Sequence, residues 1–176
     1  MIVSKKVLIA VAIIPIMIAL VIAIPKISPG DQTATSTTAQ MRIQFVKEDM
    51  KRVSFGVTET IGAQKSETLI IDNDGSALYN IDVEGEKGSQ TRFHVSAQEV
   101  KRIKALITET GFMQIPKEQF KVRANATEFT RYTLTVALDG SMKTVQWIDE
   151  SASEDFVPAL LTMLRDTLLG TIKDRK

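Results

Sequence analysis

His94 is the only histidine in the chain and therefore the side chain best suited to proton transfer near neutral pH. It lies in the segment TRFHV, residues 91–95, where its neighbours Phe93 and Val95 would point to the opposite side of a strand. No Ser-x-x-Lys or Gly-x-Ser-x-Gly pattern accompanies it, and the chain contains no cysteine. We therefore interpret His94 as a surface residue, assign no catalytic residue and predict that the protein is not an enzyme.

The stretch Asp72-Asn73-Asp74-Gly75 has the residue types of a calcium-binding loop. Such a loop needs a glycine at its sixth position and a glutamate at its twelfth, where this chain has Ala77 and Val83. A hairpin turn explains the stretch better, because Asp-Gly accommodates positive φ angles. We expect a turn here and no calcium site.

A second acidic group precedes the last expected helix and consists of Asp149, Glu150, Glu154 and Asp155. A divalent ion is one use for it, but we expect two of the carboxylates to face the positive end of that helix and the others to be solvated. No metal site and no cofactor is predicted.

A basic group on an earlier helix suits an acidic partner or lipid headgroups, or is simply a solvated face: Lys101, Arg102 and Lys104. The net charge of +1 gives no reason to expect nucleic-acid binding.

Two segments that we expect to be loops indicate binding instead. Residues 60–66, TIGAQKS, separate two expected strands and expose an apolar residue at a turn. Such a residue either anchors a partner or folds over the edge of the sheet. The candidate partner-binding residues are Ile61, Gly62, Ala63 and Gln64.

In the loop 117–130, Asn125-Ala126-Thr127 is an acceptor pattern for N-glycosylation, so Asn125 is a candidate glycosylation site. We interpret that loop as a surface connection, with a contact role left open.

Alternating apolar residues predict strands that cover 52–60, 67–72, 76–83, 91–95, 131–139 and 142–149. Asp74-Gly75 and Asp139-Gly140 are expected to close two hairpins. Ser96 and Glu99 form a capping box ahead of a helix that ends near Gly111, and a last helix begins near Phe156 or Pro158. Residues 41–51 fit either a strand or a helix.

Hairpins punctuated by two helices predict an α+β fold, an antiparallel sheet of hairpins with two helices on one face. We expect this domain to cover residues 41–176 and to follow a Ser/Thr-rich flexible linker at residues 28–40. Residues 1–27 contain an uninterrupted apolar run from Val7 to Pro25, which at about 1.5 Å per residue is long enough for a single transmembrane helix. A cleaved signal peptide is the alternative for this run.

Lys5 and Lys6 precede the apolar run, and the positive-inside rule then puts the N-terminus in the cytoplasm. The expected localisation is the cell membrane, single-pass, with the main domain extracytoplasmic. The absence of cysteine excludes disulfides, and a domain of this size needs none.

The order of elements resembles that of emfourin-like domains, the protealysin-inhibitor type, which are proteinaceous inhibitors of thermolysin-like metalloproteases. The resemblance covers about residues 52–172. It rests on the Gly-containing first hairpin, on VSAQEVKRIKALITETGFMQIP, and on RYTLTVALDGSMKTVQWIDESASEDFVPALLTMLRDTL. It implies a small α+β domain whose inhibitory surface involves loops near the first hairpin, here Ile61 to Gln64.

The sequence therefore predicts a membrane-anchored extracytoplasmic binding module, of which a metalloprotease inhibitor is one form. Its expected partners are the membrane, through the N-terminal span, and a protein, either a metalloprotease or a membrane complex. An accessory structural subunit of a membrane protein complex is the alternative function.

Overall fold

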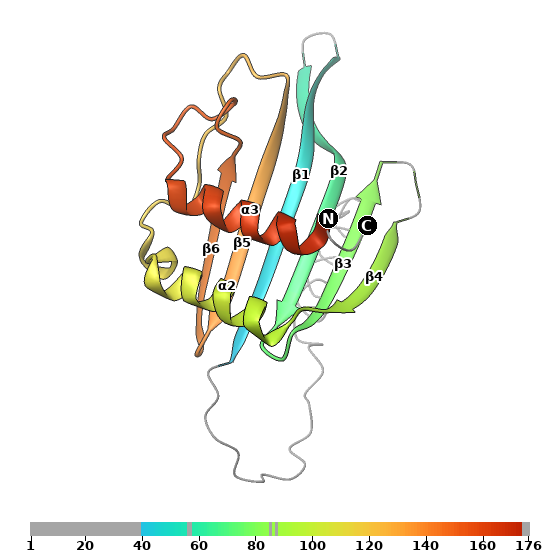
Figure 1. The fold of residues 1–176 in the computed structure, drawn as a ribbon. Helices are drawn as coiled ribbons and strands as arrows, with labels where there is room; N and C mark the ends of the chain where they lie inside the picture. Colours follow the sequence, from blue (N-terminus) through green and yellow to red (C-terminus); the bar gives the residue numbers. More distant parts are fainter. Residues whose placement is uncertain (1–39, 56–57, 85, 87, 174–176) are drawn as a thin grey trace, which may run out of the picture. The chain divides into compact units, whose positions relative to one another are not determined.

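The computed structural model describes residues 40–173, apart from 56, 57, 85 and 87. The described part is built mainly on one antiparallel sheet with the strand order β4-β3-β2-β1-β5-β6 (Figure 1). Its strands are β1 (Met41–Phe55), β2 (Thr58–Asp72), β3 (Ser76–Val83), β4 (Ser89–His94), β5 (Glu128–Leu138) and β6 (Ser141–Ile148). Two helices, α2 (Ala97–Glu109) and α3 (Ala159–Lys173), lie on the same side of this sheet, and a short 3-10 helix, η1 (Phe112–Gln114), follows α2.

The predicted fold class needs a correction. The prediction included a transmembrane helix and a flexible linker ahead of the sheet. Among the described residues no helix is long and apolar enough to cross a membrane. The described fold is instead a six-stranded antiparallel sheet with two helices. The predicted span at residues 1–27 lies outside the described residues, as does the predicted linker apart from Gln40, so the membrane localisation stays a prediction.

Both predicted Asp-Gly hairpins are confirmed. Gly75 has φ +88°, and its amide donates to the carbonyl of Asp72 at 2.9 Å, which closes the turn between β2 and β3. Asp139 and Gly140 both have positive φ, as a tight turn between β5 and β6 requires. The strand registers follow from these turns, since Ile71 pairs with Ala77 and Leu138 pairs with Ser141.

The prediction was wrong where the chain first reverses. The expected strand at 52–60 is two strands, because β1 ends at Phe55 and β2 begins at Thr58, with Phe55 paired to Thr58. The alternation of apolar residues runs across this reversal, so periodicity alone could not detect it. The expected loop at 60–66 is part of β2, and the ambiguous segment 41–51 is most of β1.

The main core lies between the helices and the sheet. The apolar stripe of α3 at Leu161, Leu164 and Leu168 is fully buried, and Ile103 of α2 and Trp147 of β6 are buried with it. Buried residues recur at the helical period in the helices and at every second position in the strands, so each element has one apolar face. The helices pack their apolar faces against the apolar face of the sheet.

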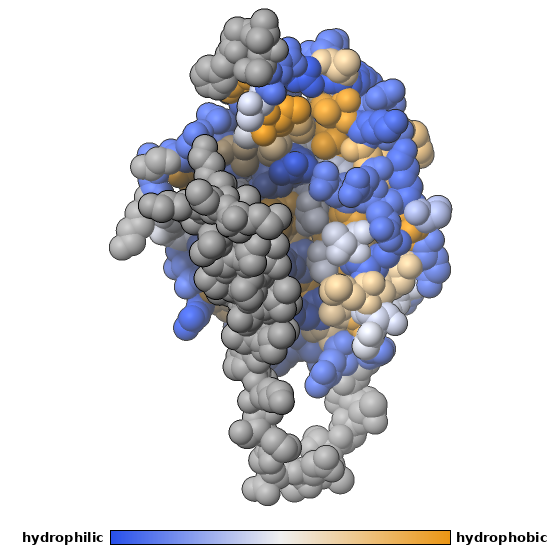
Figure 2. Space-filling view, turned by 180° about the vertical axis from the view of Figure 1, so that it is seen from behind, coloured by the Kyte–Doolittle hydropathy of each residue, from blue (hydrophilic) through white to orange (hydrophobic). Residues whose placement is uncertain are grey.

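The opposite side of the sheet is shown in Figure 2, where hydrophilic residues predominate on the described part. Arg42 and Gln44 of β1 alternate with the buried Ile43 and are exposed. A small second apolar cluster lies elsewhere and consists of Met50, Phe129, Ile148 and Ala152. Because it joins β1, β5, β6 and the turn after β6, it fixes the end of the sheet from which the hairpin β1–β2 extends.

Candidate functional site

The hairpin of β1 and β2 extends beyond its neighbours in the sheet. β1 pairs with β5 only from Met41 to Lys51, and β2 pairs with β3 only from Lys65 onward. Residues 52–55 and 58–64 therefore pair with each other and not with a third strand. We call these two segments the β1–β2 arm; they reach past β3 in Figure 1.

The candidate partner-binding residues Ile61, Gly62, Ala63 and Gln64 all lie in the β2 half of this arm. Ile61 is 42% exposed, one of the most exposed large apolar side chains of the described part. A Cβ added at Gly62 would meet no atom within 4 Å, so neither packing nor a positive φ explains this glycine. A strand glycine of this kind leaves room for an approaching chain. The four residues thus form an exposed strand edge and not the loop we expected.

The β1 side of the arm is closed by the loop that carries Asn125. The amide of Arg52 donates to the carbonyl of Thr127 at 2.7 Å, and its guanidinium donates to the carbonyl of Ala124 at 2.6 Å. Arg52 is also the cross-strand partner of Ile61. The structure therefore brings the exposed Asn125 to the same end of the sheet as the candidate binding residues. Among the described residues, the β2 side of the arm has the longer edge without a neighbouring strand, from Thr58 to Gln64.

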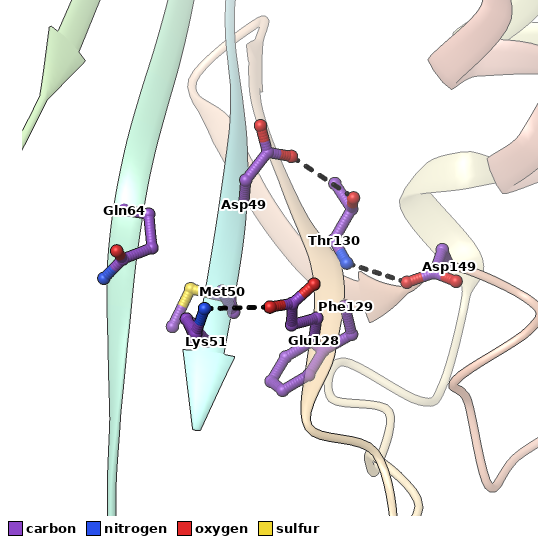
Figure 3. Close-up of a pocket in the computed structure, with 8 residues that line it drawn as sticks. All are labelled: Asp49, Met50, Lys51, Gln64, Glu128, Phe129, Thr130 and Asp149. Carbon is purple, nitrogen blue, oxygen red and sulfur yellow. Dashed lines mark hydrogen bonds and ion pairs between the residues drawn. The ribbon is translucent and has the colours of Figure 1, made fainter. Parts of the chain in front are cut away.

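A cavity of about 450 Å³ lies at the base of the arm, where β1 and β2 leave the sheet (Figure 3). It forms at a β-bulge, since the register of β1 and β2 shifts between Asp49 and Met50, opposite Gln64. The carboxylates around it are held by hydrogen bonds. Thr130 donates its amide to Asp149 at 2.8 Å and its hydroxyl to Asp49 at 3.3 Å. This wall of the cavity is consequently fixed in position.

The cavity carries more negative than positive charge. Its carboxylates are those of Asp49, Glu128 and Asp149, and its one lysine, Lys51, is paired with Glu128 at 3.0 Å. Carboxylate oxygens accept hydrogen bonds, so the cavity suits donor groups of a bound chain. Gln64 of the arm also lines it, which makes the cavity continuous with the candidate binding strand.

A buried ion-pair cluster fixes the root of the arm. Glu67 of β2 is 5% exposed and accepts hydrogen bonds from Lys65 at 2.7 Å, Lys47 at 3.1 Å and the hydroxyl of Tyr79. Burial alone would raise the pKa of Glu67, but these three bonds outweigh it and lower the pKa to about 2. Burial and the bond to Glu67 raise the pKa of Tyr79 well above its usual value. The cluster joins β1, β2 and β3 directly below the point where the arm becomes free.

Residues 51–168 match the family described as Domain of unknown function (DUF6438). The chain belongs to this family. The DUF6438 match runs from the last part of β1 to the last turns of α3, so it includes the arm, the cavity at its base and both helices. A comparison with curated proteins finds no match. The DUF6438 match does not test the resemblance to emfourin-like inhibitors, which stays a prediction.

The other candidates from the sequence lie apart from this site. His94 ends β4 beside the turn at Gly75. The Asp74 carboxylate accepts hydrogen bonds from the amide and hydroxyl of Ser76, which hold its pKa below the usual value. Through these contacts Asp74 stabilises the turn between β2 and β3 of the DUF6438 domain.

The acidic group ahead of α3 is also used within the fold. Glu150 accepts hydrogen bonds from Thr162 and Arg165, and Asp155 forms an ion pair with Lys117 at 2.6 Å. The first turn of α3 contains no acidic residue. One of the four, Glu150, does contact the first turn of α3 through the hydroxyl of Thr162, and the expectation that two of them face the N-terminal end of that helix stays a prediction. Within the DUF6438 domain, Glu150 fastens the segment after β6 to α3, and Asp155 fastens it to the segment after η1.

Sequence reasoning missed two exposed apolar residues near the start of α3. Phe156 is 86% exposed and Met163 is 52% exposed. The period of apolar residues along a helix predicts which of them are buried. It does not predict that an apolar residue will lie on the solvent-facing side of the helix. Both residues lie within the part matched to DUF6438.

Proposed function

We propose that this protein is a binding module that captures an extended segment of a partner protein along the free edge of β2 in the β1–β2 arm. The observation that carries the proposal is the arm itself. Strand β2 continues from Lys65 back to Thr58 without a neighbour on its outer side in the described part. A row of unpaired backbone groups of this kind is a template for a further strand.

The two edges of the arm differ in their contacts, and the difference favours the β2 edge as the binding edge. On the β1 side, the loop 124–127 accepts hydrogen bonds from the backbone amide and the guanidinium of Arg52. On the β2 side, the one backbone bond outside the hairpin that the described residues show is the carbonyl of Gln64 accepting the Glu84 amide at 3.0 Å. An incoming strand of about six residues could pair with the outward-facing backbone groups between Thr58 and Ala63, which belong to every second residue because the others bond to β1.

The arm also defines which side chains a partner needs. Ile61 offers an exposed apolar contact, and the vacant space over Gly62 leaves room for a large side chain on the neighbouring strand. The cluster around Glu67 holds the root of the arm in place before binding, which lowers the ordering cost of association. We infer a partner segment with an apolar or aromatic residue opposite Ile61.

The test is a selection of short random peptides displayed on phage against the full-length protein, followed by Kd measurements on the selected peptides. Ile61→Asp should raise the Kd about tenfold or more, because it replaces a central apolar contact by a charge. Ile61→Val keeps the apolar character and should bind within about threefold of the parent protein. Tenfold corresponds to about 1.4 kcal/mol.

The matched control is Met142→Asp, which removes a 75% exposed methionine from the start of β6. It should leave the Kd unchanged and the protein folded. Equal Kd values for Ile61→Asp and Met142→Asp would show that the arm is not the binding surface. So would a selection that yields no binding peptide at all.

A further inference from the structure

A protruding apolar knob lies at the start of α3, far along the chain from the arm. We define the knob as Phe156, Ala159 and Met163, all of which are exposed. Ala159 and Met163 are one helical turn apart and lie on the side of α3 opposite the buried Leu161 and Leu164. An aromatic and a thioether side chain that both project into water are a typical anchor for another protein surface.

The loop that presents Phe156 is held firmly. Asp155 forms an ion pair with Lys117 at 2.6 Å and accepts the amide of Lys121 at 2.8 Å. Val157, on the other side of Phe156, is buried in the core. Because both neighbours are fixed, the Phe156 side chain is held facing solvent. Binding a partner therefore does not have to order this loop first.

A groove of about 420 Å³ lies between α2 and the second half of α3. Thr171 donates to the carboxylate of Glu99 at 2.8 Å across its floor, which keeps the two helices in contact. Two acidic and two basic residues line it: Glu99 is bonded by Thr171 and Asp166 pairs with Arg165 at 2.9 Å, whereas Arg102 and Lys173 have no ion pair among the described residues. A Cβ added at Gly170 would meet no atom within 4 Å. The groove is therefore open at its α3 side.

The knob and the groove lie on the same side of α3 at its opposite ends. Ala159, Met163, Gly170 and Lys173 are spaced by four, seven and three residues, so they follow one face of the helix. The step from Met163 to Gly170 is two turns, about 10 Å. One surface thus carries a projection and a recess, which is the arrangement that an isologous twofold contact uses twice.

We propose that the outer face of the two helices is a self-association surface, in which the knob of one copy enters the groove of a second copy and the second knob enters the first groove. The charges agree with this pairing. The exposed Glu154 beside Phe156 would meet Arg102 or Lys173 of the other copy, and an arginine beside the Phe156 ring adds a cation–π contact. The proposal does not depend on the arm, which lies elsewhere on the molecule.

The chain contains no cysteine, which permits a clean crosslinking test. Two full-length single-cysteine proteins, Met163→Cys and Gly170→Cys, are mixed and treated with a short bis-maleimide. A covalent heterodimer should form, because the knob of one copy lies over the groove of the other. Replacing Gly170→Cys by Met142→Cys in the mixture should abolish the heterodimer.

The same crosslinking is repeated with Phe156→Asp in both proteins, together with sedimentation velocity. Since Phe156 is almost fully exposed, the variant should fold, and it should lose the heterodimer band and weaken association at least tenfold. Wild-type protein that sediments as a monomer at every concentration overturns the proposal. So does a dimer that persists in Phe156→Asp, or one that forms no crosslink between positions 163 and 170, because either places the contact elsewhere.

Discussion

Glu67 shows how one residue connects sequence, stability and the proposed site. A carboxylate with 5% exposure is costly unless it is paired, and here two lysines and a tyrosine hydroxyl pair it. The sequence placed this glutamate at the start of an expected strand, with no sign that it would be buried. Its partners Lys47 and Tyr79 come from other strands, so only the tertiary fold reveals the cluster.

The depressed pKa of Glu67 predicts acid sensitivity. Since its folded pKa is about 2 against a usual value of 4.5, the stabilisation is present above about pH 5 and is lost as the pH falls towards 2. Glu67→Gln should be less stable at neutral pH, and the difference from the parent protein should shrink through this window. Denaturant unfolding of both proteins between pH 2 and 7 measures it, with the exposed Glu109→Gln as control. A difference that stays constant with pH would argue against the ion-pair cluster.

At the scale of elements, local signals predicted well where they act within one element. The Asp-Gly turns and the start of α2 after Ser96 appear as expected. The capping box is formed on one side, since the amide of Glu99 donates to the Ser96 hydroxyl at 3.2 Å. The Glu99 carboxylate accepts a hydrogen bond from Thr171, so a contact with α3 uses the group that we expected to cap α2.

This cap gives a prediction for helix stability. Ser96→Ala should lower the free energy of unfolding by about 1 kcal/mol, because it leaves an amide of the first turn without its acceptor. The matched control is Gln98→Ala in the same turn, which should be neutral or slightly stabilising. Chemical denaturation followed by circular dichroism measures both. Equal stability of the two variants would show that the Ser96 hydroxyl contributes nothing.

What local signals failed to predict depends on contacts between elements. The arm was divided incorrectly because alternating residues continue across the reversal between Phe55 and Thr58. The segment 117–130 is largely exposed, as a surface connection should be, but its sequence did not show that Phe120 is buried or that the amide of Arg123 donates to the carbonyl of Ala152 at 2.9 Å. The candidate residues Ile61 to Gln64 were found because Ile61 is apolar beside a glycine, and not because their secondary structure was known.

At the scale of the whole molecule, the two proposed binding surfaces lie on different parts of the described structure and share one core. The arm and its cavity lie at the end of the sheet beyond β3, and the knob and groove lie on the outer side of the helices. The core between sheet and helices holds both in place. A protein built in this way can hold a partner segment and pair with a second copy without either contact obstructing the other.

The most direct test of the account is hydrogen–deuterium exchange of the full-length protein with and without a selected peptide. If an added strand pairs with the arm, the outward-facing amides between Thr58 and Gln64, every second one, should exchange at least tenfold more slowly in the complex, while those of β4 and β6 stay unchanged. Protection that appears on β4 or the helices, with the arm unaffected, would contradict the central claim that the free edge of β2 is the binding site.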